Sequence, residues 1–129
     1  MAAIASGSFD VKLGPMPLDD VAIGRMSIEK QFHGDLEATS RGQMLTAMTQ
    51  VKGSAGYVAI EMVAGSLHGK TGTFVLQHSG TMTRGDGDTI VTVVPDSGTD
   101  ELIGLAGTMT ILLEDGGHSY EFDYTLASR

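Results

Sequence analysis

The sequence predicts an all-β fold: a single antiparallel barrel of about eight strands with at most one short helical turn. Most segments between the glycines alternate apolar and polar residues, which is typical of half-buried strands. Short connections rich in Gly and Asp separate these segments, as in β-hairpins. No stretch shows a helical hydrophobic period over about ten residues. Because an open sheet of this many strands would expose two edges, closure into a barrel is favoured.

The predicted strands follow one another with only turn residues between them. The last is the clearest, since His118, Tyr120, Phe122 and Tyr124 share one face and polar residues share the other. The strand Tyr57–Leu67 is apolar on both faces, so its inward face stays open. The strands are Phe9–Leu13, Ile23–Gln31, His33–Thr39, Gln43–Lys52, Tyr57–Leu67, Thr71–Thr83, Thr89–Val94, Gly107–Leu113 and Ser119–Leu126.

Turn residues set the boundaries between these strands. One segment, DSGTDELIGLAG, lacks strand character; Thr99 is placed to cap a single helical or 3₁₀ turn through Leu102, which Gly104 would end. LHGKTG and EDGGH are the strongest hairpin signals. The turns are HGD around Gly34, SRG at Ser40–Gly42, KGSAG at Lys52–Gly56, LHGK at Leu67–Lys70, RGDGD at Arg84–Asp88 and EDGG at Glu114–Gly117.

Length and composition describe one globular domain covering residues 1–129, with 41% hydrophobic and 19% charged residues. The formal net charge of −8 opposes binding to phosphate backbones and anionic lipids, so neither nucleic acid nor membrane is expected as a partner. There are no cysteines, which excludes disulfides and thiolate chemistry. The N-terminal residues do not read as a secretory signal, and no apolar run spans a bilayer, so a soluble, cytoplasmic protein is predicted.

Motifs for metal, nucleophilic and phosphate chemistry are weak. The histidines form neither HxH nor HExxH, so no metal site is expected. Ser79 follows His78 directly, and adjacent residues on a strand point to opposite faces, so the two cannot form a catalytic pair. The Gly-rich TRGDGDT lacks the Lys-Ser/Thr tail of a phosphate loop. A cofactor-free protein is therefore expected.

Acid–base groups on strand faces are the remaining candidates for chemistry. If Glu61 points inward, burial raises its pKa and makes it a plausible general acid or base. His78 shares a strand face with Phe74 and Leu76. The predicted hairpin makes its strand the neighbour of the strand that carries Glu61. Tyr57 and Tyr124 supply phenol groups, so the candidate catalytic residues are Glu61, His78, Tyr57 and Tyr124. The plainer alternatives are a solvated Glu, a packing His and core Tyr rings.

The candidate ligand contacts are apolar side chains on the strands. We predict contacts from Phe74, Leu76, Tyr120, Phe122, Met62 and Met109. Methionines suit a pliable apolar pocket because the thioether chain is flexible and polarisable. The strand methionines that we single out for such a pocket are Met26, Met44, Met48, Met62 and Met109.

Two stretches carry a family resemblance. VVPDSGTDELIGLAGTM is similar to the glycine-rich stretch of plant dirigent proteins and is placed like the matching loop of allene oxide cyclases. Gly98–Thr99 stand for the central Gly-Thr, Leu102 for the hydrophobic position and Gly107 for the closing glycine. The chain departs from that pattern at Ser97 and Asp100.

The longer resemblance covers nearly the whole chain. KQFHGDLEATSRG, GYVAIEMVAGSLHGKTGTFVLQHSGTM, DSGTDELIGLAGTM and HSYEFDYTL resemble a bacterial domain-of-unknown-function family, numbered three-two-two-four. This resemblance implies a barrel like that of allene oxide cyclase and no established reaction. The dirigent and cyclase relatives imply an apolar lumen that holds a reactive small molecule in one shape, and the cyclases imply a homo-oligomer.

The expected function is binding of a small apolar or aromatic molecule in the barrel lumen. In one form the protein is a cofactor-free isomerase, cyclase or conjugate-addition-type enzyme, where shape and desolvation contribute much of the effect. In the alternative form it is a non-catalytic, lipocalin-like binding protein. A third reading is an assembly module whose lumen is filled by its own side chains.

Overall fold

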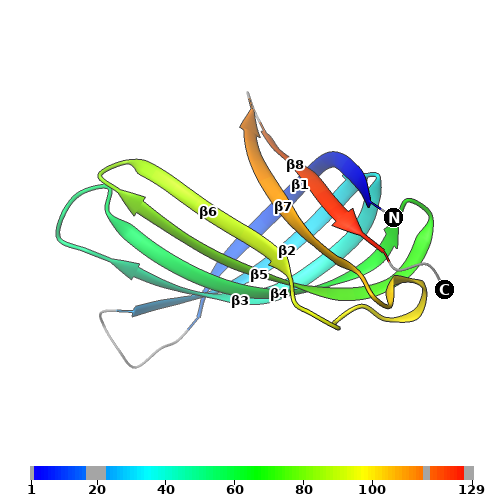
Figure 1. Cartoon of the computed structure of the whole chain (residues 1–129). Coiled ribbons are helices and arrows are strands. Elements are labelled where there is room, and N and C mark those ends of the chain that lie inside the picture. Colours follow the sequence, from blue (N-terminus) through cyan, green and yellow to red (C-terminus); the bar gives the residue numbers. More distant parts are fainter. Residues whose placement is uncertain (1, 17–22, 115–116, 127–129) are drawn as a thin grey trace.

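The computed structural model describes residues 2–16, 23–114 and 117–126, and these residues form a closed antiparallel barrel of eight strands (Figure 1). Each strand pairs with the one before it, and the first pairs with the last. The elements are β1 (Ala2–Met16), β2 (Ile23–Gly34), β3 (Leu36–Met48), β4 (Ala55–Leu67), β5 (Lys70–Thr83), β6 (Asp86–Val93), the 3₁₀ turn η1 (Asp100–Leu102), β7 (Ala106–Glu114) and β8 (Gly117–Thr125).

The predicted all-β barrel is confirmed, but one predicted turn is wrong. β3 runs without interruption through Ser40–Gly42, where the sequence suggested a break between His33–Thr39 and Gln43–Lys52. Gly42 does not form a turn. It lets the backbones of β3 and β4 approach closely, because a Cβ there would lie 2.0 Å from the carbonyl oxygen of Ile60. The predicted turn at Gly34 is confirmed, with φ of 102°. The predicted EDGG turn includes residues 115–116, which lie outside the described residues.

The predicted short helical turn is η1, and its cap differs from expectation. Thr99 occupies the N-cap position but makes no capping hydrogen bond. Its hydroxyl instead lies 2.7 Å from the Thr73 hydroxyl and accepts a 3.0 Å hydrogen bond from the Thr73 amide. Leu102 is buried, so η1 is anchored on β5 by packing as well as by these bonds. Gly104, with φ of 89°, follows the turn as predicted.

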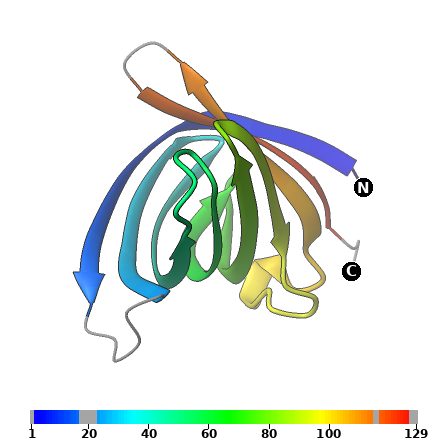
Figure 2. The same ribbon diagram turned by 90° about the vertical axis from the view of Figure 1, so that its left-hand side faces the viewer.

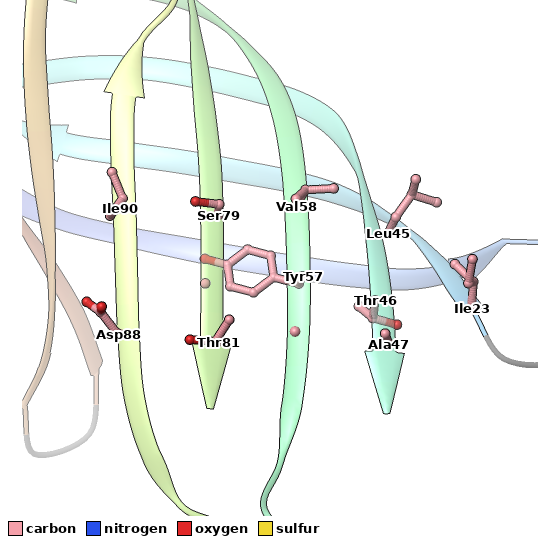
Figure 3. A pocket seen from close by; sticks show the side chains of 12 residues that line it. Ile23, Leu45, Thr46, Ala47, Tyr57, Val58, Ser79, Thr81, Asp88 and Ile90 are labelled. Carbon is pink, nitrogen blue, oxygen red and sulfur yellow. The ribbon is translucent and has the colours of Figure 1, made fainter. Parts of the chain in front are cut away.

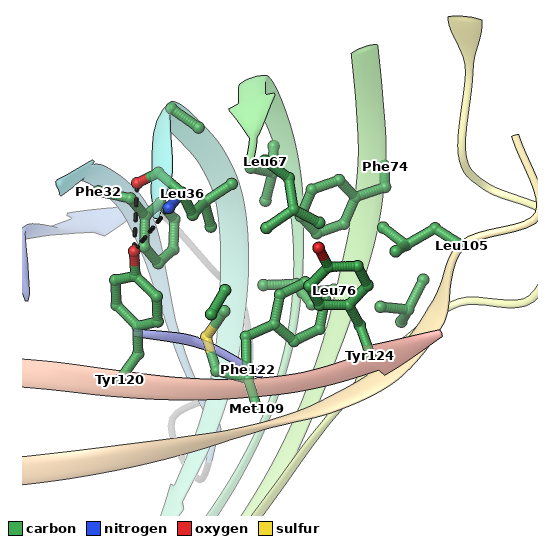
Figure 4. Packing of buried hydrophobic residues seen from close by; sticks show 14 of the residues in the cluster. Phe32, Leu36, Leu67, Phe74, Leu76, Leu105, Met109, Tyr120, Phe122 and Tyr124 are labelled. Carbon is green, nitrogen blue, oxygen red and sulfur yellow. Dashed lines mark hydrogen bonds between the residues drawn. The ribbon is translucent and has the colours of Figure 1, made fainter. Parts of the chain in front are cut away.

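Large side chains fill the lumen near the β4–β5 turn, a region we call the packed half (Figure 4). Phe74 and Phe122 stack with ring centroids 5.9 Å apart, and Phe32 meets Tyr120 edge-on at 5.6 Å. Each such side chain contributes about 1.5–3 kcal/mol when fully buried. The buried inward residues drawn include Phe32, Leu36, Leu67, Phe74, Leu76, Leu105, Met109, Tyr120, Phe122 and Tyr124.

The opposite part of the barrel, near the β3–β4 and β5–β6 turns, is less completely enclosed, and we call it the open half. β6 and β7 pair at only two positions, Val91 with Met109 and Thr92 with Thr108. β1 pairs with β8 no further than Phe9 and then continues beside β2 alone. The strands β2–β6, with the end of β1 beside β2, therefore extend beyond the closed section as a curved sheet, which lies on the left of Figure 1 and nearest the viewer in Figure 2. Within the described residues, no helix is long and apolar enough to cross a membrane.

Candidate functional site

A cavity of about 340 Å³ lies in the open half. Strand alternation turns the side chains of Met44, Met48 and Met82 to the inner face, together with the hydroxyls of Thr46 and Thr89. The full lining is Met44, Thr46, Met48, Ala55, Gly56, Tyr57, Gly80, Thr81, Met82, Gly87 and Thr89. No charged side chain is among these described residues. The cavity is therefore an apolar, methionine-walled pocket with a few hydroxyl groups.

Tyr57 forms the inner end of this pocket. It faces Gly80 across the β4–β5 ladder, and its ring extends from β4 towards β5 (Figure 3). A Cβ on Gly80 would lie 2.4 Å from ring atom Cε1, so the glycine is what gives the ring room. Burial raises the pKa of Tyr57, a hydrogen bond with Thr89 opposes that rise, and the charge of Glu61 adds to it. At neutral pH the phenol is protonated and able to donate a hydrogen bond.

Beneath Tyr57, four polar side chains from four adjacent strands meet in the lumen. Glu61 is fully buried, and its carboxylate accepts hydrogen bonds from Lys30 Nζ at 2.9 Å and Ser40 Oγ at 2.8 Å. His78 Nε2 lies 2.5 Å from Glu61 Oε2, yet it has no hydrogen-bond partner of good geometry among the described residues. The Tyr57 and His78 rings have centroids 6.5 Å apart. We call Lys30, Ser40, Glu61 and His78 the buried ion cluster.

The pKa of Glu61 moves against the direction predicted from burial. Burial does raise it, but the close contact with the His78 imidazole and the positive charge of Lys30 lower it by more, so the pKa of Glu61 falls to about 2. The prediction of a raised pKa is therefore wrong, because it considered Glu61 without Lys30 and His78 beside it. Glu61 stays ionised at neutral pH, so it orients His78 and holds the Lys30 charge; it does not supply a proton.

Lys30 also connects the ion cluster to the packed half. Its Nζ lies 5.0 Å from the ring centroid of Phe9 and 5.7 Å from that of Phe32, both cation–π distances. The ion cluster thus stands at the boundary between the packed and open halves. In the described part of the chain, no group of three or more His, Asp or Glu side chains is arranged to hold a metal ion.

The structure brings together three of the four predicted catalytic residues. Tyr57, Glu61 and His78 are neighbours on the inner faces of β4 and β5. Tyr124 lies at the far end of the packed half, where its hydroxyl is 2.6 Å from Nδ1 of His68 in the β4–β5 turn. His68 and His78 are ten residues apart on one chain segment, roughly 30 Å at the rise of an extended strand. Tyr124 therefore cannot act with the other three.

The predicted ligand-contact residues are placed differently from expectation. Phe74, Leu76, Phe122 and Met109 are buried in the packed half and fill its lumen, as does Tyr120. Tyr120 has a structural role, because its hydroxyl donates to the carbonyl of His33 and accepts from the amide of Leu36, both at 2.9 Å. Met62 lies on the outside of the barrel with 51% of its surface exposed, on the opposite face of β4 from Glu61.

Several site residues were missed from the sequence. Of the pocket methionines, the sequence reasoning identifies Met44 and Met48 but not Met82. Lys30 and Ser40 were also missed. A signal for Lys30 was present: it alternates with Ile28 and Phe32, so an apolar face of β2 carries one cation.

Comparison with known proteins identifies a family. The model described as "Protein of unknown function (DUF3224)" matches residues 5–124. Among solved structures, the crystal structure of a protein with unknown function from the DUF3224 family of Shewanella oneidensis MR-1 is 50% identical, covers 100% of both chains and has a TM-score of 0.94. A comparison with curated proteins found no match. The predicted likeness to this family is confirmed; the likeness to allene oxide cyclases and dirigent proteins stays a prediction.

Proposed function

The chain belongs to the DUF3224 family of proteins of unknown function, and we propose that it binds a small apolar or aromatic molecule in the open half of its barrel. The observation that carries this proposal is the cavity of about 340 Å³ on the inner face of β3–β6. Ligand sites typically measure about 300–1,000 Å³ and are mostly apolar with a few placed polar groups. The methionine walls and the three hydroxyls of Tyr57, Thr46 and Thr89 match that description.

The charges around the pocket favour a neutral ligand. The described lining residues carry no charge, and the nearest buried charges belong to the ion cluster beneath Tyr57. An anionic ligand would lose its hydration without gaining a cation, because Lys30 is already paired with Glu61. A ring system with one hydroxyl or carbonyl group would pack against the methionines and exchange a hydrogen bond with Tyr57.

Filling the pocket with a side chain tests the proposal. A Cβ at Gly87 would have nothing within 4 Å, so Gly87→Leu places its side chain in the cavity without a clash. We expect the wild type to bind the neutral dye N-phenyl-1-naphthylamine saturably, with one dye per chain by fluorescence titration. Gly87→Leu should weaken that binding by at least about tenfold, or ~1.4 kcal/mol.

The matched control is Thr110→Leu, which adds the same side chain to the exposed outer face of β7, away from the cavity. It should bind the dye as the wild type does. Equal binding by Gly87→Leu and Thr110→Leu would place the dye elsewhere and remove the support for a lumen site. The folded state of each variant is checked by its thermal midpoint.

Catalysis is the second candidate function, favoured by the short contact between Glu61 and His78 beneath Tyr57. The ionised Glu61 would orient the imidazole and stabilise its cation. His78 would take a proton from a carbon next to a ligand carbonyl while the Tyr57 hydroxyl hydrogen-bonds the carbonyl oxygen. Return of that proton to a different carbon completes an isomerisation with no net gain or loss of atoms. His78 is buried, so the Tyr57 ring must move aside first.

Proton exchange separates a catalyst from a binder. Ligands found with the dye-competition assay are incubated with protein in D₂O and followed by NMR. A catalyst exchanges or relocates the ligand's carbon-bound proton, and His78→Gln abolishes this while dye binding persists. A binder returns the ligand unchanged and undeuterated. Exchange that survives in both His78→Gln and Glu61→Gln would remove these residues from a catalytic role.

A further inference from the structure

The outside of the sheet β2–β6 carries a contiguous set of apolar side chains. Strand alternation that turns Tyr57 and Glu61 inward turns their neighbours outward. Leu45, Val58, Ile60, Met62 and Ile90 are between 43% and 58% exposed. We call this surface, with the residues that flank it, the outer face.

These side chains are adjacent on the sheet. In the ladder, Leu45 pairs with Val58, Val58 with Ser79, and Ser79 with Ile90, so one row crosses four strands (Figure 3). Two hollows of about 810 and 520 Å³ cover this region and share Leu45, Val58 and Ser79. Single exposed apolar residues are ordinary, but a contiguous hollowed patch marks an interaction site.

Charge at the two edges of the outer face identifies the occupant. The β2 edge carries Arg25, whose guanidinium is held by Gln43 Oε1 at 2.6 and 3.0 Å. The β6 edge carries Asp88. The whole chain has a net charge of −8, so two copies repel each other over most of their surfaces. A surface with a cation at one edge and an anion at the other is complementary to a second copy of itself when opposite edges are brought together.

We propose that the outer face is the interface of a two-fold symmetric dimer of this chain. With the axis running along β4, the β2 edge of one copy lies over the β6 edge of the other. Arg25 then lies over the Ile90 row of β6, two residues from Asp88, so its long side chain reaches towards that carboxylate once at each edge, as symmetry requires. The outward residues of β4, Val58 and Ile60, meet their own counterparts at the centre. This assembly goes beyond ligand binding, and it leaves the lumen pocket on the other side of the sheet free.

A matched pair of isoleucine substitutions tests the interface. Ile60 and Ile4 are both exposed on outer strand faces, at 50% and 61%, but Ile4 lies on β1, outside the patch. We expect wild type and Ile4→Glu to sediment as dimers across the micromolar range. Ile60→Glu brings two carboxylates together on the axis and should weaken the dimer by at least tenfold. A monomeric wild type, or equal dimerisation by the two variants, would overturn the proposal.

A charge exchange tests the orientation and does not depend on any single variant folding well. Arg25→Asp and Asp88→Arg should each weaken the dimer, because each creates like-charge contacts at both edges. The double variant carries the opposite pair in both copies and should recover most of the lost association. Additive weakening in the double variant would overturn the proposed axis along β4. The thermal midpoint of each variant serves as the independent check that it is folded.

Discussion

The packed half and the open half of this barrel share the strands β3–β6, yet one is solid and the other holds a cavity. In the packed half the inward positions carry Phe32, Phe74 and Phe122, and strands β7 and β8 enclose them. In the open half the inward positions carry Gly80, Gly87 and flexible methionines. Strand alternation alone therefore decides which residues face the lumen; side-chain volume and strand closure decide whether the lumen is filled.

The buried ion cluster marks where one half changes into the other. Lys30 lies against the rings of Phe9 and Phe32 on the packed side, while Tyr57 covers His78 on the pocket side. A charge in a packed core costs several kcal/mol unless it is paired and hydrogen-bonded. Glu61 meets that need for Lys30, so the cluster has a structural role whether or not the protein is a catalyst.

The largest loss of folding stability is expected from a substitution in the buried ion cluster at this boundary. Glu61→Gln leaves Lys30 buried without its anion, and loss of one partner of a buried ion pair costs about 3–5 kcal/mol. Urea unfolding monitored by circular dichroism measures the change. Glu121→Gln, on the exposed outer face of β8, should stay within about 0.5 kcal/mol of wild type. Similar stabilities for the two variants would show that Lys30 reaches water and that the boundary is not closed.

Replacing one methionine in each half compares how tightly the two halves are packed. Met109 is 3% exposed in the packed half, and Met109→Ala should cost about 2–5 kcal/mol through lost packing and a new cavity. Met44 lines the pocket, and Met44→Ala enlarges a space that is already open, so it should cost under about 1 kcal/mol. The same urea experiment measures both. Equal losses would mean that the open half collapses around its methionines in solution.

Sequence alternation predicted the barrel and put Glu61 and His78 on neighbouring strands, because period-two patterning depends on neighbouring residues alone. It left open which face of the Tyr57–Leu67 strand points inward. It misread Gly42 as a turn residue, since a glycine that admits a close backbone looks the same in sequence. It assigned Met62 to the lumen because both faces of β4 are apolar. Which half is filled depends on how far β7 follows β6, a long-range register that local patterns do not contain.

The next largest loss of folding stability is expected at acidic pH, where Glu61 becomes protonated. The folded pKa of Glu61 is about 2 against an ordinary 4.5, so its stabilisation is fully present above pH 4.5 and is lost as the pH falls towards 2. The linked contribution is roughly 3 kcal/mol at neutral pH. Urea midpoints measured at each pH should fall more steeply for wild type than for Glu61→Gln. Parallel curves would show that Glu61 titrates normally and that His78 and Lys30 do not hold its charge.

The smallest losses of folding stability are expected from removing the hydroxyl group of either of two tyrosines. Tyr120→Phe removes the bridge between the His33 carbonyl and the Leu36 amide, leaving buried backbone groups unpaired at a cost of about 1–3 kcal/mol. Tyr57→Phe in the open half loses one hydrogen bond beside a water-accessible cavity and should cost under about 1 kcal/mol. Thermal unfolding compares them, and dye titration gives the opposite order: Tyr57→Phe alters binding and Tyr120→Phe does not. A reversed stability order would mean that Tyr57, not the aromatic core, holds β4 and β5 in place.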